Sequence, residues 1–353
     1  RPDEMAAQVV RALVERTGID AKEVEDLIVG CAFPEGEQGL NVARLIGFLA
    51  ELPIAVAGTT VNRFCGSSMQ AIHMAAGAIQ LDAGEAFLCA GIESMSRVPM
   101  AGFNPLLHPG LAERFPAAYI SMGETAENVA RRHQITRKRQ EELAVLSHRK
   151  AAVARGEGRL KDEIAPVIVN GKTVDADGCI RADTSLEALA ELKPAFATDG
   201  SVTAATSSPL TDGASAVLVT SEDYAKAHGL KPLARIKSVA VAGCEPDVMG
   251  MGPVAATRKA LQRAGLTVKD LDIVELNEAF AAQALACADE LGLDLEKTNL
   301  DGGAIALGHP LGATGAMILG SLVDELERRD LRYGLATLCV GGGMGIATVV
   351  ERV

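Results

Sequence analysis

The sequence contains no tryptophan, and aromatic residues make up only 3% of its 353 residues. It also lacks any apolar run long enough to span a bilayer, so no membrane span is expected. Its seven cysteines are odd in number and form no CxxC pair, which disfavours a disulfide framework or a zinc site and favours the reduced thiols of a cytoplasmic protein. Positive charge is outnumbered, since 34 Lys and Arg residues stand against 46 Asp and Glu residues. The net charge of −12 argues against nucleic acid as the main partner.

Small and apolar residues are abundant instead. Hydrophobic residues make up 48% of the chain and there are 36 glycines, a composition typical of a soluble α/β protein. A chain of 353 residues exceeds what one hydrophobic core usually supports, so we expect two or more domains.

An internal repeat divides the chain into two similar parts. Residues 12–29 predict a helix, a glycine stop and a buried strand, and residues 260–274 predict the same series. Cys65 and His309 then fall at corresponding turns, and the apolar run 86–91 corresponds to residues 337–341. This alignment predicts that Cys89 is the pseudo-equivalent of Cys339. The repeat therefore indicates two similar α/β halves.

The repeat also predicts a strand that the first half does not contain. The second half has an apolar strand at 233–241 ahead of its first helix, whereas the first half begins directly at that helix. A central strand is not readily lost from a covered sheet, so we expect about 20 to 30 residues to precede Arg1 in the whole protein. Any targeting signal there would not be visible in this sequence.

Three glycine-rich turns carry the candidate chemistry. They surround Cys65 in 61–68 (VNRFCGSS), His309 in 302–315 (GGAIALGHPLGATG) and Cys339 in 334–345 (GLATLCVGGGMG). A helix N-terminus at a strand-to-helix turn favours the thiolate form of a cysteine. Glycines leave backbone N–H groups uncovered, so that an oxyanion can approach them. These turns indicate acyl chemistry through a cysteine.

In its motifs the sequence resembles the thiolases, and most closely the degradative 3-ketoacyl-CoA thiolases of fatty-acid β-oxidation. Seven segments in the family's order carry the resemblance across nearly the whole chain. They are the three glycine-rich turns together with 91–96 (GIESMS), 122–128 (MGETAEN), 206–214 (TSSPLTDGA) and 277–281 (NEAFA).

The resemblance implies a fold of two βαβαβαββ halves, packed as a layered α/β/α/β/α sandwich with an inserted loop domain. The expected first half comprises residues 1–97 plus about 206–232, the loop domain residues 98–205 and the second half residues 233–353. The loop domain should be helical from 123 to about 155. Residues 131–161 contain ten Lys or Arg residues but only three acidic residues. They form either a solvated helix face or a surface that attracts coenzyme A phosphates.

The resemblance also implies roles for individual residues. Cys65 would be the acyl-accepting nucleophile, with its pKa lowered to about 7 by the helix terminus and a neighbouring histidine. His309 would take the Cys65 proton and donate to the substrate oxyanion. Cys339 would move a proton to or from the α-carbon of acetyl-CoA. Asn277 would hold a water in one oxyanion hole, and the backbone N–H groups of Cys65 and Gly341 would form the second.

The resemblance further implies a site for the substrate, coenzyme A. Ser208 would contact the pantetheine arm, although its hydroxyl could instead cap a local turn. Met122, Ala279 and Phe280 would contribute to substrate binding. No metal and no bound cofactor is expected, since the sequence has no phosphate-binding or dinucleotide fingerprint.

Two alternatives to a degradative thiolase remain, together with open questions about assembly. The first is an acetoacetyl-CoA thiolase working in the condensing direction; its relatives often carry histidine where Ser121 stands here. The second is a non-catalytic scaffold subunit. A ketosynthase is disfavoured, because that relative has a histidine where Cys339 stands. The resemblance implies acyl-CoA as a partner, a homodimer or dimer of dimers, and a possible hydratase/dehydrogenase subunit.

Overall fold

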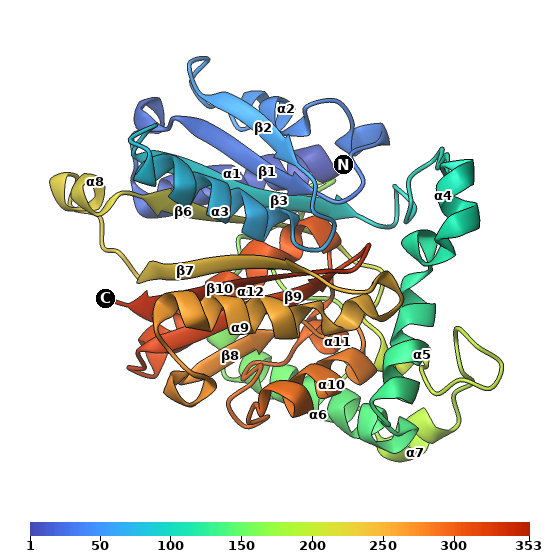
Figure 1. Cartoon of the computed structure of the whole chain (residues 1–353). Helices are drawn as coiled ribbons and strands as arrows, with labels where there is room; N and C mark the ends of the chain where they lie inside the picture. Colours follow the sequence, from blue (N-terminus) through green and yellow to red (C-terminus); the bar gives the residue numbers. More distant parts are fainter.

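The computed structural model describes residues 1–353 and contains two four-stranded sheets, one above the other in Figure 1. The first sheet has the strand order β2-β1-β3-β6 and the second the order β7-β10-β9-β8. The strands of the first sheet are β1 (Asp26–Cys31), β2 (Ala57–Val61), β3 (Ala86–Ser94) and β6 (Asp212–Thr220). Those of the second are β7 (Ala234–Gly243), β8 (Ile273–Leu276), β9 (Tyr333–Val340) and β10 (Met344–Arg352).

The two sheets share one pattern of connections, which confirms the predicted repeat. In the first sheet β1 is parallel to β2 and β3, and β3 is antiparallel to β6. In the second, β8 is parallel to β9, which is antiparallel to β10. A parallel bridge between Val274 and Thr298 takes the place of the β1–β2 pairing. The antiparallel pairing of β7 with β10 completes the second sheet.

Helices separate and cover the sheets in five layers. Helices α3 (Ser67–Gln80) and α12 (Leu311–Arg328) lie in the middle, where a cluster of buried apolar side chains includes residues of both sheets. The outer layer of the first half has α1 (Pro2–Thr17) and α2 (Val42–Leu49), and that of the second has α9 (Gly252–Ala264) and α10 (Ala281–Leu291). This is the expected α/β/α/β/α order.

Glycines end the equivalent first helices of the two halves. Helix α1 stops at Gly18 and α9 stops at Gly265, and both glycines have a φ of 68°. This left-handed conformation is costly for residues with a Cβ, and it lets the chain turn directly toward the next strand. The predicted glycine stops are thereby confirmed.

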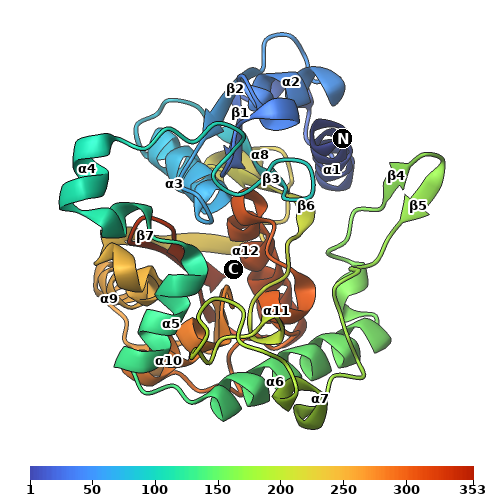
Figure 2. The ribbon, with the colours of Figure 1, turned by 90° about the vertical axis from the view of Figure 1, so that its right-hand side faces the viewer.

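The segment between the halves wraps around one side of the molecule. In Figure 2 it runs from α4 past α5, follows the base along α6, and rises to the β4–β5 hairpin. Its elements are α4 (Pro109–Arg114), α5 (Met122–Arg132), α6 (Arg137–Gly156), β4 (Val167–Val169), β5 (Lys172–Val174) and α7 (Leu186–Ala190). The helical stretch expected from 123 to about 155 is present, divided into the two helices α5 and α6. The chain breaks at Gln134, which has a φ of 54°, and Thr136 caps the new helix α6.

The remaining helices are short. They are α8 (Glu222–Ala227), α11 (Ala304–Leu307) and the 3₁₀ turns Ala21–Glu23, Gly36–Gln38, Pro116–Tyr119, Arg159–Lys161, Ala204–Thr206, Pro246–Met251 and Val268–Asp270. None of the helices has both the length and the apolar character needed to cross a bilayer.

Candidate active site

Cys65 lies in a tight turn between β2 and α3. Phe64, the residue before it, adopts a left-handed φ of 41°, and the hydroxyl of Ser67 holds the turn closed. That hydroxyl accepts the Arg63 N–H at 2.9 Å and donates to the Phe64 carbonyl at 2.6 Å. Gly66 caps α3, and a Cβ there would lie only 2.9 Å from Ile346 Cγ2 on β10. The turn therefore places the thiol at a helix N-terminus, against the second sheet.

The environment of the Cys65 thiol differs from the sequence expectation. Its pKa is raised to about 12, mainly by removal from water and to a smaller extent by the buried carboxylate of Glu93. A hydrogen bond from the Gly341 backbone opposes this shift but does not outweigh it. The predicted lowering of the pKa to about 7 is therefore wrong for the free protein. Cys65 is a neutral thiol at neutral pH, so its proton must leave as the sulfur attacks.

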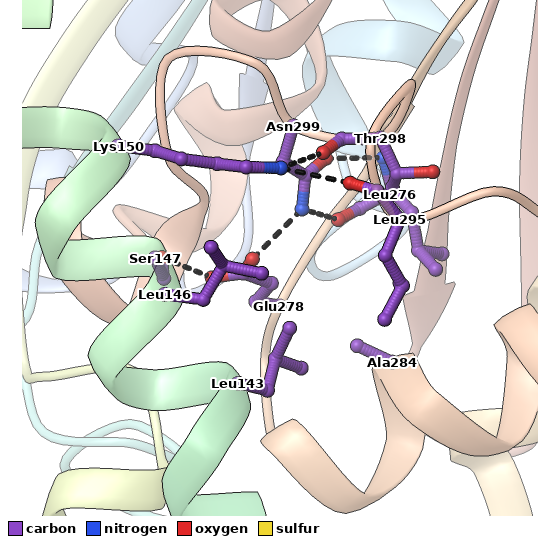
Figure 3. Close-up of a pocket in the computed structure, with 10 residues that line it drawn as sticks. All are labelled: Leu143, Leu146, Ser147, Lys150, Leu276, Glu278, Ala284, Leu295, Thr298 and Asn299. Carbon is purple, nitrogen blue, oxygen red and sulfur yellow. Dashed lines mark hydrogen bonds between the residues drawn. The ribbon is translucent and has the colours of Figure 1, made fainter.

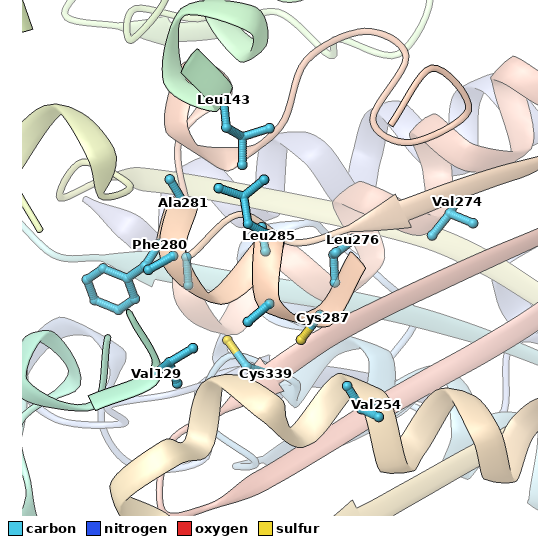
Figure 4. Packing of buried hydrophobic residues seen from close by; sticks show 14 of the residues in the cluster. Val129, Leu143, Val254, Val274, Leu276, Phe280, Ala281, Leu285, Cys287 and Cys339 are labelled. Atoms are coloured by element: carbon cyan, nitrogen blue, oxygen red, sulfur yellow. The ribbon is translucent and has the colours of Figure 1, made fainter. Parts of the chain in front are cut away.

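Cys339 lies near the end of β9 and is completely buried. Figure 4 shows it within the apolar cluster of the second half, together with Cys287 of α10. Burial raises the pKa of the Cys339 thiol well above its ordinary value, and the neighbouring Cys65 raises it further. The structure thus places two neutral thiols close together, one of which can act as a proton donor.

The expected correspondence between Cys89 and Cys339 is wrong. Cys89 points into the central layer, where its sulfur lies 3.6 Å from the Ala71 carbonyl of α3. Cys339 belongs instead to the outer cluster of the second half. Side chains alternate across a strand, so an alignment that is displaced by one residue exchanges the two faces of the sheet. The sequence alignment of the two apolar runs could not detect that displacement.

His309 and Asn277 meet at the end of β8. Asn277 directly follows β8, and its backbone N–H donates to the Thr337 carbonyl of β9 at 3.0 Å. Its side-chain Nδ2 lies 3.4 Å from His309 Nε2, while its Oδ1 is buried without a hydrogen-bond partner. Burial lowers the pKa of His309 to about 4, so the imidazole is neutral at neutral pH.

Two threonines that the motif analysis overlooked hold His309 in place. Thr314 Oγ1 lies 2.7 Å from His309 Nδ1, and the His309 backbone N–H donates to Thr211 Oγ1 at 3.0 Å. Thr314 lies in the first turn of α12, five residues after the histidine, so the motif contained a signal for it. Thr211 comes from a different motif, and only the fold brings it to the histidine. With Nδ1 engaged by Thr314, Nε2 is the nitrogen that faces the site.

The predicted binding residues form two groups, one beside Gly341 and one around Ala279. Met122 lies over Gly341, since a Cβ on that glycine would be 3.6 Å from its sulfur. Ser208 donates its backbone N–H to the Ala279 carbonyl at 3.0 Å, beside Phe280. The Ser208 hydroxyl makes no hydrogen bond within the protein. The turn-capping role considered for it is therefore absent from this structure.

Most of the basic residues of 131–161 already have partners in the protein. Five form ion pairs: Arg132 with Asp247, Arg137 with Glu141, Lys138 with Glu142, Arg139 with Asp289 and Arg159 with Asp301. Lys150 donates to two backbone carbonyls. The four that form neither an ion pair nor a hydrogen bond to a carbonyl are Arg131, Arg149, Arg155 and Lys161. These four are the cations of this segment that remain available to an anionic ligand.

The raised pKa of Cys65 leads to a testable pH dependence. We expect alkylation of Cys65 by iodoacetamide to accelerate about tenfold per pH unit from pH 7 to 10, because only about one thiol in 10⁵ is ionised at pH 7. Peptide mass spectrometry over a pH series measures this rate, with a free model thiol as control. A plateau with a midpoint near pH 7 would show a stable thiolate and contradict the structure.

The whole chain is similar to known proteins. Family models for the thiolase N-terminal and C-terminal domains match residues 1–223 and 230–352, respectively. A 3-ketoacyl-CoA thiolase of Vibrio cholerae serotype O1 is 51% identical over 364 aligned residues, covering 100% of this chain and 93% of that protein. A 3-ketoacyl-CoA thiolase of Acinetobacter baumannii is 52% identical over 362 residues, covering 100% and 92%.

Proposed function

Since this chain belongs to the thiolase family, we propose that it is a 3-ketoacyl-CoA thiolase of fatty-acid β-oxidation. Such an acyltransferase cleaves 3-ketoacyl-CoA with coenzyme A to give acetyl-CoA and a shortened acyl-CoA. The observation that best supports this function is the proximity of Cys65 to Cys339, together with the contact between Asn277 and His309. Two neighbouring thiols suit a reaction in which one thiol carries the acyl group and the other protonates the carbanion.

In the first half of the proposed reaction, Cys65 attacks the 3-keto carbon and His309 takes its proton. The two pKa shifts disfavour a thiolate–imidazolium pair before substrate arrives, so proton transfer accompanies attack. The bond between C2 and C3 then breaks, leaving the acyl group on Cys65. His309 and a water held by Asn277 stabilise the acetyl-CoA enolate, and the unpartnered Asn277 Oδ1 supports such a role. Cys339 donates its proton to the enolate carbon.

In the second half, coenzyme A gives its proton to the Cys339 thiolate and attacks the acyl group on Cys65. The backbone N–H groups of Cys65 and Gly341 stabilise the thioester oxygen as the tetrahedral intermediate forms. The Cys65 sulfur leaves and recovers its proton from His309. Both thiols and the imidazole thus return to their starting protonation states, and the cycle requires no bound cofactor or metal, only coenzyme A as a substrate.

The proposed domain division assigns coenzyme A to the inserted segment. The first half comprises residues 1–97 plus about 206–232, the loop domain residues 98–205 and the second half residues 233–353. The four unpaired cations of 131–161 support phosphate binding by the loop domain. Met122, Ser208, Ala279 and Phe280 would hold the pantetheine arm and the acyl chain between this domain and the two halves.

Ser208→Ala tests the pantetheine contact. We expect KM for coenzyme A to rise about two- to tenfold with kcat unchanged, because a lost hydrogen bond weakens binding by about 0.5 to 1.5 kcal/mol. The melting temperature should not move, since the Ser208 hydroxyl has no partner within the protein. The matched control is Ser207→Ala, whose hydroxyl donates to the Thr203 carbonyl at 2.8 Å. The control should cost about 1 kcal/mol of stability and leave KM unchanged; the reverse pattern would exclude Ser208 from the coenzyme A site.

Thiolysis of acetoacetyl-, medium-chain and long-chain 3-ketoacyl-CoA tests the proposed function directly. Loss of the absorbance of the magnesium enolate of each substrate follows cleavage. We expect kcat/KM to be higher for medium or long chains than for acetoacetyl-CoA. Activity confined to acetoacetyl-CoA would favour the short-chain, condensing alternative, and no cleavage of any substrate would favour a scaffold.

We further propose a cytoplasmic homo-oligomer. All seven cysteines are free thiols, which supports a reducing compartment. Strand β2 is an open edge of the first sheet, and three apolar side chains of the adjacent α2 are exposed, namely Leu45, Phe48 and Leu49. Pairing of two such edges would form a dimer, and two dimers a tetramer. Sedimentation of the chain at micromolar concentration as a monomer would refute this; co-purification tests a hydratase/dehydrogenase partner separately.

A further inference from the structure

A buried carboxylate lies immediately beside the proposed oxyanion amide. Glu278 follows Asn277 in the chain and is almost completely inaccessible to solvent. It accepts hydrogen bonds from the Ser147 hydroxyl at 2.7 Å, Asn299 Nδ2 at 2.9 Å and the Ile305 backbone N–H at 3.3 Å. Figure 3 shows its bonds to Ser147 and Asn299. Glu278 therefore joins helix α6, the loop after α10 and helix α11 at one point.

The same cluster holds the segment that leads to His309. Besides donating to Glu278, the Ser147 hydroxyl accepts the Gly303 backbone N–H at 3.0 Å. A Cβ at Gly303 would collide with the Glu278 carboxylate. Gly302 has a left-handed φ of 88°, and a Cβ there would lie 2.7 Å from the Cβ of Ala151. The start of this segment is thus packed directly against α6 and Glu278, with no room for adjustment.

The residue before Asn277 is held equally tightly. Asn299 accepts the Leu276 N–H and donates to the Leu276 carbonyl, both at 2.9 Å. Lys150 of α6 in turn fixes the loop that carries Asn299, by donating to the carbonyls of Leu295 at 2.8 Å and Thr298 at 2.9 Å. These four bonds are drawn in Figure 3. Helix α6 therefore supports both sides of Asn277.

We propose that Glu278 and Ser147 are positioning residues that hold the Asn277 amide against His309, which makes helix α6 a structural part of the catalytic apparatus. The inference rests on the site proposed above. Both side chains are buried. Glu278 connects the strand end that carries Asn277 to the segment that carries His309, through Ser147 and Ile305. A displacement of about 1 Å between such groups can cost on the order of 100-fold in rate.

Ser147→Ala tests this proposal with the smallest change. We expect kcat for thiolysis to fall about 10- to 100-fold while KM for coenzyme A stays within about twofold. The matched control is Ser238→Ala, which removes another buried hydroxyl of the second half, bonded to the Ala260 carbonyl at 2.7 Å. The control should lower the melting temperature by a similar amount and leave kcat unchanged. Equal kcat values for the two variants would overturn the proposal.

Glu278→Gln provides an independent test at the same point. Whichever way the new amide turns, its NH₂ group meets an N–H donor, either that of Asn299 or that of Ile305. We expect a loss of kcat at least as large as that of Ser147→Ala, again without a comparable change in KM. A fall in melting temperature with kcat retained would show a purely structural role and overturn the assignment.

A double variant that combines Ser147→Ala with Asn277→Ala shows whether Ser147 acts by positioning the Asn277 amide or by a separate effect. Once the Asn277 amide is removed, Ser147→Ala should lower kcat by less than about threefold further, because the amide that Ser147 helps to position is no longer present. A full additional 10- to 100-fold loss would show that Ser147 acts by another route and would refute the proposal. If Asn277→Ala by itself retained full activity, the proposed site would be wrong, and that result is distinct from failure of the positioning role.

Discussion

Replacement of Cys65 by alanine should abolish thiolysis, with a fall in kcat of at least about 10⁴-fold and complete loss of the acyl-enzyme. The structure gives the chain one thiol at a helix N-terminus that also accepts a backbone N–H from Gly341. No other cysteine combines these features, so we expect no other sulfur to accept the acyl group in its place. Incubation with radiolabelled acyl-CoA, followed by peptide mapping, measures the covalent intermediate directly.

Cys89→Ala is the control for this experiment. Cys89 is completely buried in the central layer, and its sulfur lies against the Ala71 carbonyl. Its loss should cost some stability through a small cavity and leave both the acyl label and kcat intact. Label on the Cys339 peptide of the otherwise unmodified enzyme would reverse the assignment of the nucleophile.

Replacement of Cys339 by alanine should separate the two chemical steps. The variant should still accept an acyl group from a simple acyl-CoA onto Cys65, because that step needs no proton at the α-carbon. Cleavage of 3-ketoacyl-CoA should fall about 10²- to 10⁴-fold, the usual contribution of a general acid. The raised pKa of Cys339 supports this expectation, since the group enters the reaction as a protonated thiol. Acylation and thiolysis are measured on the same preparation.

Cys287→Ala is the matched control, because this neighbouring thiol is equally buried in the same apolar cluster. Its sulfur donates to the Gly250 carbonyl at 3.1 Å and takes no part in the proposed reaction. The control should lose about 1 kcal/mol of stability and retain thiolysis. Parallel loss of acylation and cleavage in Cys339→Ala would instead indicate a collapsed site and would remove its role as acid.

Local sequence determined where helices end and which turns hold the candidate catalytic residues. The glycine stops at Gly18 and Gly265 and the turns around Cys65 and His309 depend on neighbouring residues, through backbone conformations that few side chains tolerate. Hydrophobic periodicity and the internal repeat were sufficient to predict two similar α/β halves, because each half must bury the same faces of its own sheet. The order of the motifs along the chain was sufficient to identify the family.

Only the tertiary structure decided how these elements act together. The direction of the Cys65 pKa shift depends on desolvation by distant segments, which no local pattern records. The opposite faces of Cys89 and Cys339 depend on strand register, because a displacement of one residue reverses every side chain. Helix α6 reaches Glu278 through Ser147, 131 residues away along the chain, because packing brings them together and their spacing in the sequence does not.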